Sequence, residues 1–543
     1  MTADAAALAD ELLDVLGTFA PLEATFTGIP GHDAELPDLG EAAQGRLRAR
    51  AADVLARAQA SDDPDRVTLG VVAQQAEAVL ARLDARLVEF TLAAPMEAAG
   101  IKQLSFLTKL TLSGDRAEED FLTRLAALPA FYATLAGRQH DGLRAGRQPV
   151  ERMAGSAIAY LDRFLAQETP FPQPLTGDRG ERRDRLVAEE IRPAVVRYRD
   201  FLATEIAGHG RPDGRPGLCW IENGEATYAS LVRMHTTTER TPEELHQLGL
   251  DVLAGLEAEY AEIGGRAFGL AEPAAVRDRL RTDETLRWRD ADEMLENARA
   301  AVARATAVAA DWFPRLPKAE CVVRAAPEAE APVAAPAYYL PPALDGSRPG
   351  TYFTNTHEVR TRVRFLAESV AFHEAVPGHH FEVSLAQELT GLPQLRTLAP
   401  VTAYREGWGL YSERLADEMG LYSDDLMRLG MLAADSTRVA RLVVDTGLHA
   451  LRWTREQCVD FLRTRTVLSE VEVQSETDRY IECPGQALAY MTGRLEIVRL
   501  RRFAEAELGD SFDIKDFHDV VLGGGPVPLT VLGDVVRDWV ASV

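Results

Sequence analysis

Residues 442–451 read LVVDTGLHAL, and their apolar side chains include Leu442, Val443, Leu448 and Leu451. Apolar residues that recur three or four positions apart line one face of an α-helix. The same spacing occurs near the start of the chain, in residues 13–19, LDVLGTF. With 543 residues, 46% of them hydrophobic, the chain can bury a large core. We therefore predict a mainly α protein.

Loops and one strand interrupt this helical pattern. Residues 1–205 read as a succession of helices, and the loop GHGRPDGRPG (208–217) follows them. A second loop, residues 327–350, is rich in Pro and Ala. It precedes residues 351–355, TYFTN, which are the best candidate for a strand. From there to about residue 508 the pattern is helical again, so we expect little β-structure.

The charge balance excludes two classes of partner. The formal net charge is −25 and the pI about 5.0, and an acidic surface repels nucleic acid and anionic membranes. Residues 1–16, MTADAAALADELLDVL, carry acids where a signal peptide has basic residues. No apolar run of about 18 residues, the length that spans a membrane, is present. We therefore predict a cytoplasmic protein that binds neither nucleic acid nor a membrane.

A dense group of histidines marks the candidate site. The stretch AFHEAVPGHHFE (371–382) contains His373, His379 and His380, three of the chain's eleven histidines. Zinc prefers imidazole and carboxylate ligands, and a catalytic zinc keeps three protein ligands and one open position. Glu374, beside the first histidine, is placed to act as general base on a metal-activated water. The alternative interpretation is that these histidines only cap a broken helix.

Pro377 separates this stretch from the common H-E-x-x-H motif, in which the second histidine would stand at position 377. His380 lies two helical turns after His373, about 10 Å along a regular helix, which is too far for one ion to bridge. Proline interrupts helical hydrogen bonding, and Gly378 permits a tight bend. We expect the helix to end or bulge after Glu374, so that His379 or His380 returns to His373.

Glu406 is the predicted third protein ligand. It lies in YREGWGLYSE (404–413), 26 residues past His380, and shares a helix face with Glu413. A carboxylate that faces a core containing Trp408 and Tyr411 needs a partner, and a metal ion is one. Glu413 is equally well explained as a solvated or ion-paired residue. The chain's four cysteines form no CxxC motif, so we predict a single ion held by nitrogen and oxygen donors, which suits zinc and also manganese or cobalt.

A third cluster supplies polar candidates for the substrate, in residues 478–493, DRYIECPGQALAYMTG, and just beyond. Tyr480 and Tyr490 are candidate catalytic donors to a developing oxyanion. Gln486 and Arg494 are candidate donors to the substrate. Each of the four is also readily explained as a packed or surface residue.

These stretches resemble the bacterial domain-of-unknown-function 885 family over roughly residues 215–500. The resemblance is carried by HEAVPGHH (373–380), REGWGLYSERLADEMG (405–420), RYIECPGQALAYMTG (479–493), ENGEATYASLVRMHTTTERTPEELHQLG (222–249) and YYLPPALDGSRPGTYFTNT (338–356). That family is similar to helical zincins such as thimet oligopeptidase and carboxypeptidase Taq. Those enzymes use H-E-x-x-H on one helix and a glutamate ligand on the next.

The resemblance implies an elongated helical body with a deep cleft and a small β-sheet near the active site. Residues 1–205 would form an N-terminal helical region, and residues 206–543 a zincin-like catalytic region. In zincins an edge strand binds the peptide backbone, which would make Tyr352 and Asn355 substrate-binding residues. Tyr480 or Tyr490 would stabilise the oxyanion.

The resemblance also assigns the metal ligands. His373, one of His379 and His380, and Glu406 would hold the ion, with Glu374 as the base. His379 matches the Gly-His pair of thimet oligopeptidase. His380 has the better spacing to Glu406 by comparison with carboxypeptidase Taq, so we favour His380 as the ligand and place His379 behind it or on the substrate.

The predicted function is a zinc-dependent hydrolase that acts on short peptides, with Glu374 as the general base. One alternative is a metal-dependent hydrolase of a non-peptide amide or ester. Another is a helical binding protein that keeps the metal site without turnover. An intact Glu374 argues against the binding protein, because a purely structural zinc needs no base and normally has four protein ligands.

Overall fold

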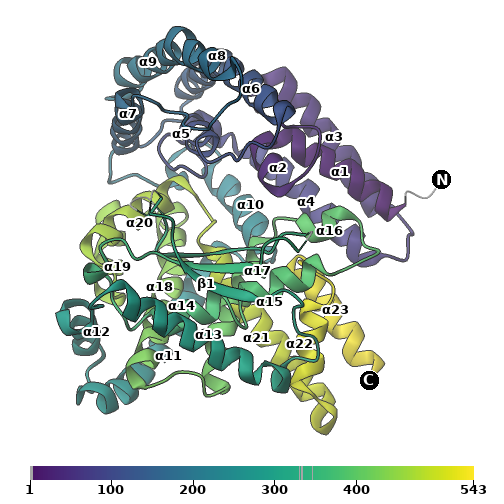
Figure 1. Cartoon of the computed structure of the whole chain (residues 1–543), viewed down its shortest axis with the longest axis vertical. Coiled ribbons are helices and arrows are strands. Elements are labelled where there is room, and N and C mark those ends of the chain that lie inside the picture. Colours follow the sequence, from purple (N-terminus) through teal and green to yellow (C-terminus); the bar gives the residue numbers. More distant parts are fainter. Residues whose placement is uncertain (1–3, 329, 332–333, 345) are drawn as a thin grey trace.

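The structure, a computed structural model, describes residues 4–328, 330–331, 334–344 and 346–543 (Figure 1). Helices account for 68% of it and strands for 3%, which confirms the mainly α prediction and the small sheet. Residues 329, 332, 333 and 345 of the predicted loop 327–350, and residues 1–3, lie outside the described residues. Among the described helices, none is long and apolar enough to span a bilayer.

The N-terminal helices fill the upper part of Figure 1. α1, α3 and α4 pack against one another, and the long helix α6 packs against α8 and α9. Gly114 is the N-cap of α6, and two acidic residues in its first turn face the positive end of the helix dipole. Their bounds are α1 Ala5–Phe19, α2 Pro21–Thr27, α3 Glu41–Gln59, α4 Arg66–Ala85, α5 Ala99–Leu107, α6 Asp115–Arg144, α7 Glu151–Ala166, α8 Arg179–Leu186 and α9 Arg192–Phe201.

A second group of helices leads to the sheet. α11 begins with a capping box, in which Thr241 and Glu244 satisfy each other's backbone N–H groups. The bounds are α10 Gly224–Thr236, α11 Pro242–Phe268, α12 Pro273–Thr282 and α13 Ala291–Trp312, then β1 Cys321–Ala325, β2 Ala337–Leu340 and β3 Gly350–Thr354.

The sheet has the strand order β1-β3-β2. β3 pairs in parallel with β1, so that Cys321 lies opposite Gly350, and antiparallel with β2, so that Leu340 lies opposite Thr351. The predicted strand 351–355 is therefore present, but it is the central strand and not an edge strand. Because both of its sides are occupied, β3 cannot offer its backbone to a peptide, and that expectation was wrong.

The C-terminal helices surround α18, whose residues are almost all buried. α18 packs against α11, α14, α17 and α21, and the charged residues on it include Asp435, Arg438 and Asp445. The bounds are α14 Ala367–Glu374, α15 His379–Gln387, α16 Gln394–Leu398, α17 Thr402–Glu418, α18 Asp425–His449, α19 Arg455–Arg465, α20 Glu470–Glu482, α21 Leu488–Leu508, α22 Ile514–Leu522 and α23 Leu529–Ser542.

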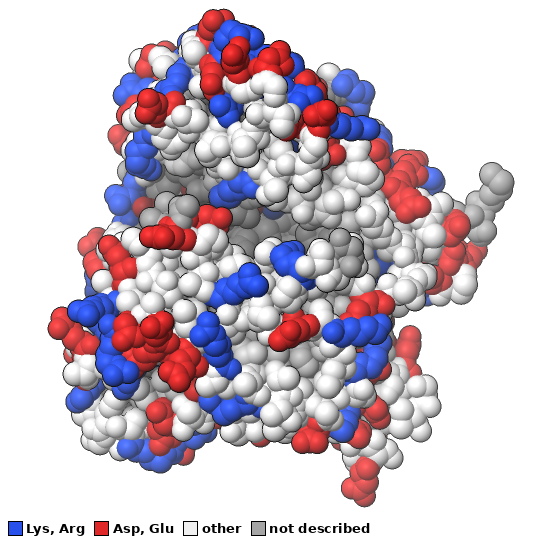
Figure 2. Space-filling model, in the orientation of Figure 1, with Lys and Arg blue, Asp and Glu red and all other residues white. Residues whose placement is uncertain are grey.

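Two hydrophobic clusters run across the predicted boundary between residues 205 and 206. One joins Leu12 and Val72 of the N-terminal helices to Trp408 of α17. The other joins Phe121 of α6 to Val444 of α18. The two predicted regions therefore share their cores, although Figure 2 shows the surface hollowed between the N-terminal helices and the part below them.

Candidate metal centre

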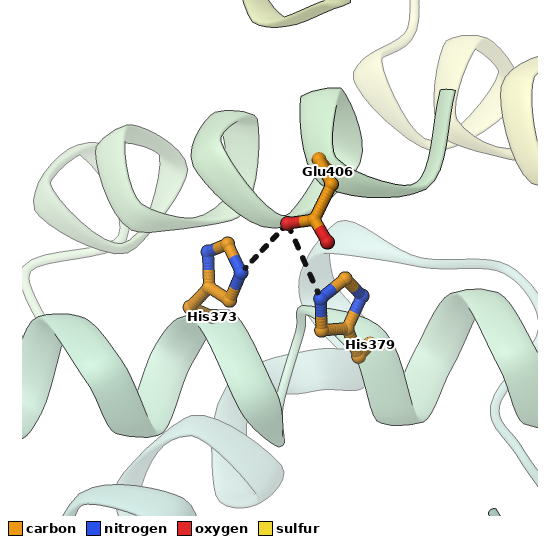
Figure 3. A group of neighbouring side chains, drawn as sticks. All are labelled: His373, His379 and Glu406. Atoms are coloured by element: carbon orange, nitrogen blue, oxygen red, sulfur yellow. Dashed lines mark ion pairs between the residues drawn. The ribbon is translucent and has the colours of Figure 1, made fainter. Parts of the chain in front are cut away.

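Three side chains from separate elements converge on one point (Figure 3). His373 comes from the end of α14, His379 from the start of α15, and Glu406 from the first half of α17. Oε2 of Glu406 lies 3.5 Å from Nε2 of His373 and 3.9 Å from Nε2 of His379. One ligand atom from each residue lies within 4.8 Å of the other two.

This donor set fits a divalent metal ion. Zinc–ligand bonds of about 2.0–2.2 Å place neighbouring ligands of a tetrahedral ion roughly 3.4 Å apart, close to the two Glu406 distances. Two imidazoles and one carboxylate are also the ligands of many catalytic zinc sites, which leave a fourth position open. Among the described residues, the cluster contains no cysteine, so the ion would be held by nitrogen and oxygen donors alone.

The bend between α14 and α15 brings the two histidines together. α14 ends at Glu374, as predicted, and α15 begins at His379, with a cis peptide bond between Val376 and Pro377. A Cβ atom on Gly378 would lie 1.9 Å from the carbonyl oxygen of His373, so only glycine fits there. The indole of Trp408 donates to the Pro377 carbonyl at 2.9 Å and fastens the bend to α17.

His379, and not His380, completes the cluster, which corrects the preference for His380. Nε2 of His380 lies 3.1 Å from the carbonyl oxygen of Ala319, and its Nδ1 lies 2.9 Å from the hydroxyl of Tyr339. Neighbouring residues on a helix point about 100° apart, so one of the two faces α17 and the other faces the sheet. His380 therefore holds the sheet against α15.

Glu413 supports His373 from behind. Its Oε1 lies 2.9 Å from Nδ1 of His373, and its Oε2 accepts a hydrogen bond from Ser369. A carboxylate on the distal nitrogen of a metal-binding histidine fixes the ring's tautomer and orientation. Gly409 makes room for the ring, because a Cβ atom there would lie 2.5 Å from Cε1 of His373. Sequence reasoning left Glu413 undecided, although its spacing of seven residues from Glu406 was the signal.

The three residues have unlike charges. Burial lowers the pKa of His373, but Glu406 and Glu413 outweigh burial and raise it to about 10. Burial lowers the pKa of His379 to about 4, with help from the charge on His373. Burial raises the pKa of Glu406, but the two histidines outweigh it and bring it to about 2. Without a metal ion, His373 thus carries a proton, and its positive charge lies where a metal cation would bind.

Glu374 lies beside the cluster without joining it. Its carboxylate is half-buried and forms no hydrogen bond or ion pair with any described residue. Burial raises the pKa of Glu374 more than the positive charges of His373 and Arg438 lower it. Tyr490 also belongs to this neighbourhood: burial raises the pKa of its phenol first, and the charge of Glu406 raises it further. The charge of Glu406 thus acts on both the carboxyl of Glu374 and the phenol of Tyr490.

The other candidates of the third cluster serve the structure. Tyr480 is fully buried and donates to Glu476 at 2.6 Å, so it cannot touch a substrate. Gln486 accepts from Arg479 at 2.8 Å. Arg494 pairs with the buried Asp435 at 2.6 Å. These positions correct the oxyanion role of Tyr480 and the substrate roles of Gln486 and Arg494.

The two candidates around the strand are also corrected. Tyr352 is 2% exposed and packs in the core, where burial is the main cause that raises the pKa of its phenol and the charge of Glu374 adds to it. The amide of Asn355 donates to the carbonyl oxygens of Ala331 and Ala334 and accepts from the N–H of His357. Asn355 therefore holds the preceding loop, and neither side chain is open to a peptide.

Comparisons with known proteins place the chain in a family. The family described as "Bacterial protein of unknown function (DUF885)" matches residues 21–536. A crystal structure of a candidate lipoprotein from Colwellia psychrerythraea is similar to this chain, with 27% identity, a TM-score of 0.88 and 99% of each chain covered. A candidate lipoprotein of unknown function from Shewanella oneidensis shares the fold at 17% identity, with a TM-score of 0.77 over 98% of this chain and 100% of that one. No curated protein matches this chain. Since the match spans nearly all of the sequence, the chain belongs to the DUF885 family.

Proposed function

We propose that this protein is a metal-dependent hydrolase that holds zinc at His373, His379 and Glu406 and cleaves short peptides. The observation that supports it best is the combination of a three-donor cluster with a free carboxylate, Glu374, beside it. A structural zinc normally has four protein ligands and needs no base. Manganese or cobalt would suit the same donors.

The chain's own residues divide the work. A zinc ion bound at this cluster would polarise a scissile carbonyl and make a water molecule easier to deprotonate. Glu374 takes a proton from the attacking water and passes it to the leaving amine, a role that its burial favours by raising its pKa. Glu413 keeps the His373 ring in place. The phenol of Tyr490 donates to the oxyanion that develops on the carbonyl.

The first test is metal content together with hydrolysis. Purified protein should contain about one divalent ion per chain, as expected of a single three-ligand site. Cleavage of short peptides should stop after chelation and return when zinc is added. A panel of peptides, small amides and esters separates a peptidase from a hydrolase of other substrates. A protein that binds no divalent ion would overturn the proposal.

The second test is Glu374→Gln. This change keeps the shape of the side chain and should leave zinc bound, because Glu374 is not a ligand. Turnover should fall by about 10²–10⁴-fold, the usual contribution of a general base. The matched control is Glu388→Gln, which changes a carboxylate at the far end of α15 that contacts Lys318. Equal turnover in the Glu374→Gln and control proteins would exclude the base role of Glu374.

A further inference from the structure

Arg438 on α18 is a cation without a partner. Within the part of the chain that the structure describes, it forms no hydrogen bond or ion pair, and its Nε atom is buried and unpaired. The other arginines nearby are neutralised: Arg441 pairs with Glu476 at 3.2 Å, and Arg494 with Asp435 at 2.6 Å. A half-buried guanidinium that hydrogen-bonds to no described group keeps its N–H donors free for an anion from outside the chain.

The neighbours of Arg438 on α18 show which way it faces. Asp435, three residues before it, pairs with Arg414 of α17 and Arg494 of α21. Arg441, three residues after it, lies over the ring of Tyr490 at 4.8 Å. Residues three apart share a helix face, so Arg438 lies between these two on the face that meets α17 and α21. The proposed ligand Glu406 lies on α17.

Electrostatics agree with this placement. Burial and the charge of Glu406 raise the pKa of Glu374, and the charge of Arg438 lowers it. It also lowers the pKa of Glu406, after the larger effects of burial and the two histidines. Arg438 pairs with neither carboxylate, and its helix packs against α14 and α17, which carry Glu374 and Glu406. Its guanidinium faces the space in which a substrate of the proposed hydrolase would lie.

We propose that Arg438 binds the free C-terminal carboxylate of a peptide, and that the protein is a carboxypeptidase-type enzyme. α18 packs against both α14 and α17, which carry Glu374 and Glu406. An extended peptide advances about 3.3–3.6 Å per residue, so this placement suits a carboxylate one or two residues beyond the cleaved bond. Arginine matches a carboxylate with two parallel hydrogen bonds. The inference names the substrate of the proposed hydrolase and therefore rests on that function.

The experiment measures peptide binding, so that it does not depend on turnover. The zinc-loaded Glu374→Gln protein is titrated in a calorimeter with acetyl-Ala-Phe-Ala as the free acid, with the same peptide as its C-terminal amide, and with acetyl-Ala-Glu-Ala amide. The free acid should bind about 10- to 100-fold more tightly than its amide, the difference expected of a charge-assisted pair. Adding Arg438→Ala should remove that preference and leave amide binding unchanged.

Two further variants keep the test decisive. Arg438→Lys retains the charge and should recover part of the preference for the free acid. Arg428→Ala removes an arginine on the same helix that pairs with Asp417, and should change nothing. The assignment would be overturned if Arg438→Ala weakened binding of the free acid and of the amide equally. It would also be overturned if the protein with Arg438 intact bound both peptides equally well. Tighter binding of the peptide whose carboxylate is on its internal Glu would overturn it as well.

This experiment and that of the proposed function fail in different ways. Absence of metal binding would remove the hydrolase, but the acid-over-amide preference can still be measured without zinc. If zinc content and hydrolysis are normal but Arg438→Ala does not change the preference for the free-acid peptide, only the inference about the C-terminus is removed.

Discussion

His373 depends on two carboxylates that act on opposite nitrogens of its ring. Glu406 faces Nε2 at 3.5 Å, on the side of the proposed ion. Glu413 faces Nδ1 at 2.9 Å and is itself held by Ser369. If the ion replaces the proton on Nε2, Glu413 keeps the proton on Nδ1. The negative charge of Glu413 then makes the imidazole a stronger donor.

Glu413→Gln should therefore weaken zinc binding without removing a ligand. Glutamine keeps the shape of the side chain but loses the charge, and outer partners of this kind contribute about 10–100-fold to metal affinity. Competition between the protein and a zinc-binding dye measures the change. The control is Glu418→Gln at the exposed end of the same helix. Equal affinities in the two variants would show that Glu413 only packs against His373.

Asp445 gives a residue-scale prediction that does not involve the metal. It is fully buried on α18, and its Oδ1 accepts from the hydroxyl of Tyr228 at 2.6 Å and from the N–H of Gly485 at 2.9 Å. Burial raises its pKa to about 7, against these two hydrogen bonds. Between about pH 4 and 7 the folded protein holds a proton that the unfolded chain has released. The stability that this proton contributes is lost as the pH rises through 7.

Asp445→Asn mimics the protonated form and should remove that loss. The melting temperature of the variant, relative to the unmodified protein, should therefore be higher at pH 8 than at pH 5. Calorimetry at the two pH values measures it, with the exposed Asp460→Asn on α19 as control. A difference that stays constant between pH 5 and pH 8 would show that Asp445 is ionised in the folded protein throughout.

At the scale of elements, the site consists of the bend between α14 and α15, which packs against α17. Sequence reasoning predicted the bend, because proline and glycine at 377–378 cannot continue a helix. It favoured His380 over His379, which was wrong, because the choice depends on the rotation of α15 about its axis. That rotation is set by hydrogen bonds to residues outside α15. Trp408 donates to the carbonyl of Pro377, and His380 bonds with Ala319 and Tyr339.

The same limit explains the other corrections. The strand 351–355 was predicted from its own residues, but its central place depends on β1 and β2, which the sequence did not predict. Tyr480 and Arg494 are polar residues in a promising stretch, and only the fold reveals Glu476 and Asp435 as their partners. Local pattern thus predicts helices, the bend and the ligand types. Long-range contacts decide which polar groups remain free.

Gly409→Ala tests whether α17 must lie this close to α14. The new Cβ would be 2.5 Å from Cε1 and 2.8 Å from Nδ1 of His373, so the ring has to move away from Glu413. Zinc affinity should fall by about tenfold or more, as when a ligand loses its supporting hydrogen bond. Gly255→Ala on α11 is the matched control, because nothing lies within 4 Å of its new Cβ. That change should raise stability by up to about 1 kcal/mol. Unchanged zinc affinity in Gly409→Ala would count against the geometry of Figure 3.

At the scale of the whole molecule, the N-terminal helices are joined to the part that carries the site. The hydrophobic clusters already described cross between them, and the carboxylate of Glu482 adds a polar link. Glu482 ends α20, and it accepts from the N–H groups of Leu92, Ala93 and Ala94 at 2.9, 2.5 and 2.6 Å. The division at residues 205–206 and the cytoplasmic location stay predictions, and the first of these can be tested by unfolding.

Glu482→Gln should destabilise the protein as a whole. The side-chain amide can turn its oxygen toward Ala93 and Ala94, but its NH₂ group then faces the N–H of Leu92, so one buried donor loses its acceptor. The loss is about 1–3 kcal/mol, typical of a buried group left unsatisfied. Glu470→Gln, at the exposed start of the same helix, should cost far less, because its pair with Arg463 lies in solvent. Because the cores are shared, the Glu482→Gln protein should unfold in a single transition at a lower temperature, with helix content and tryptophan fluorescence lost together. If instead helix content falls in two steps, with zinc retained after the first, residues 1–205 form a separable unit and the shared cores do not couple the two regions.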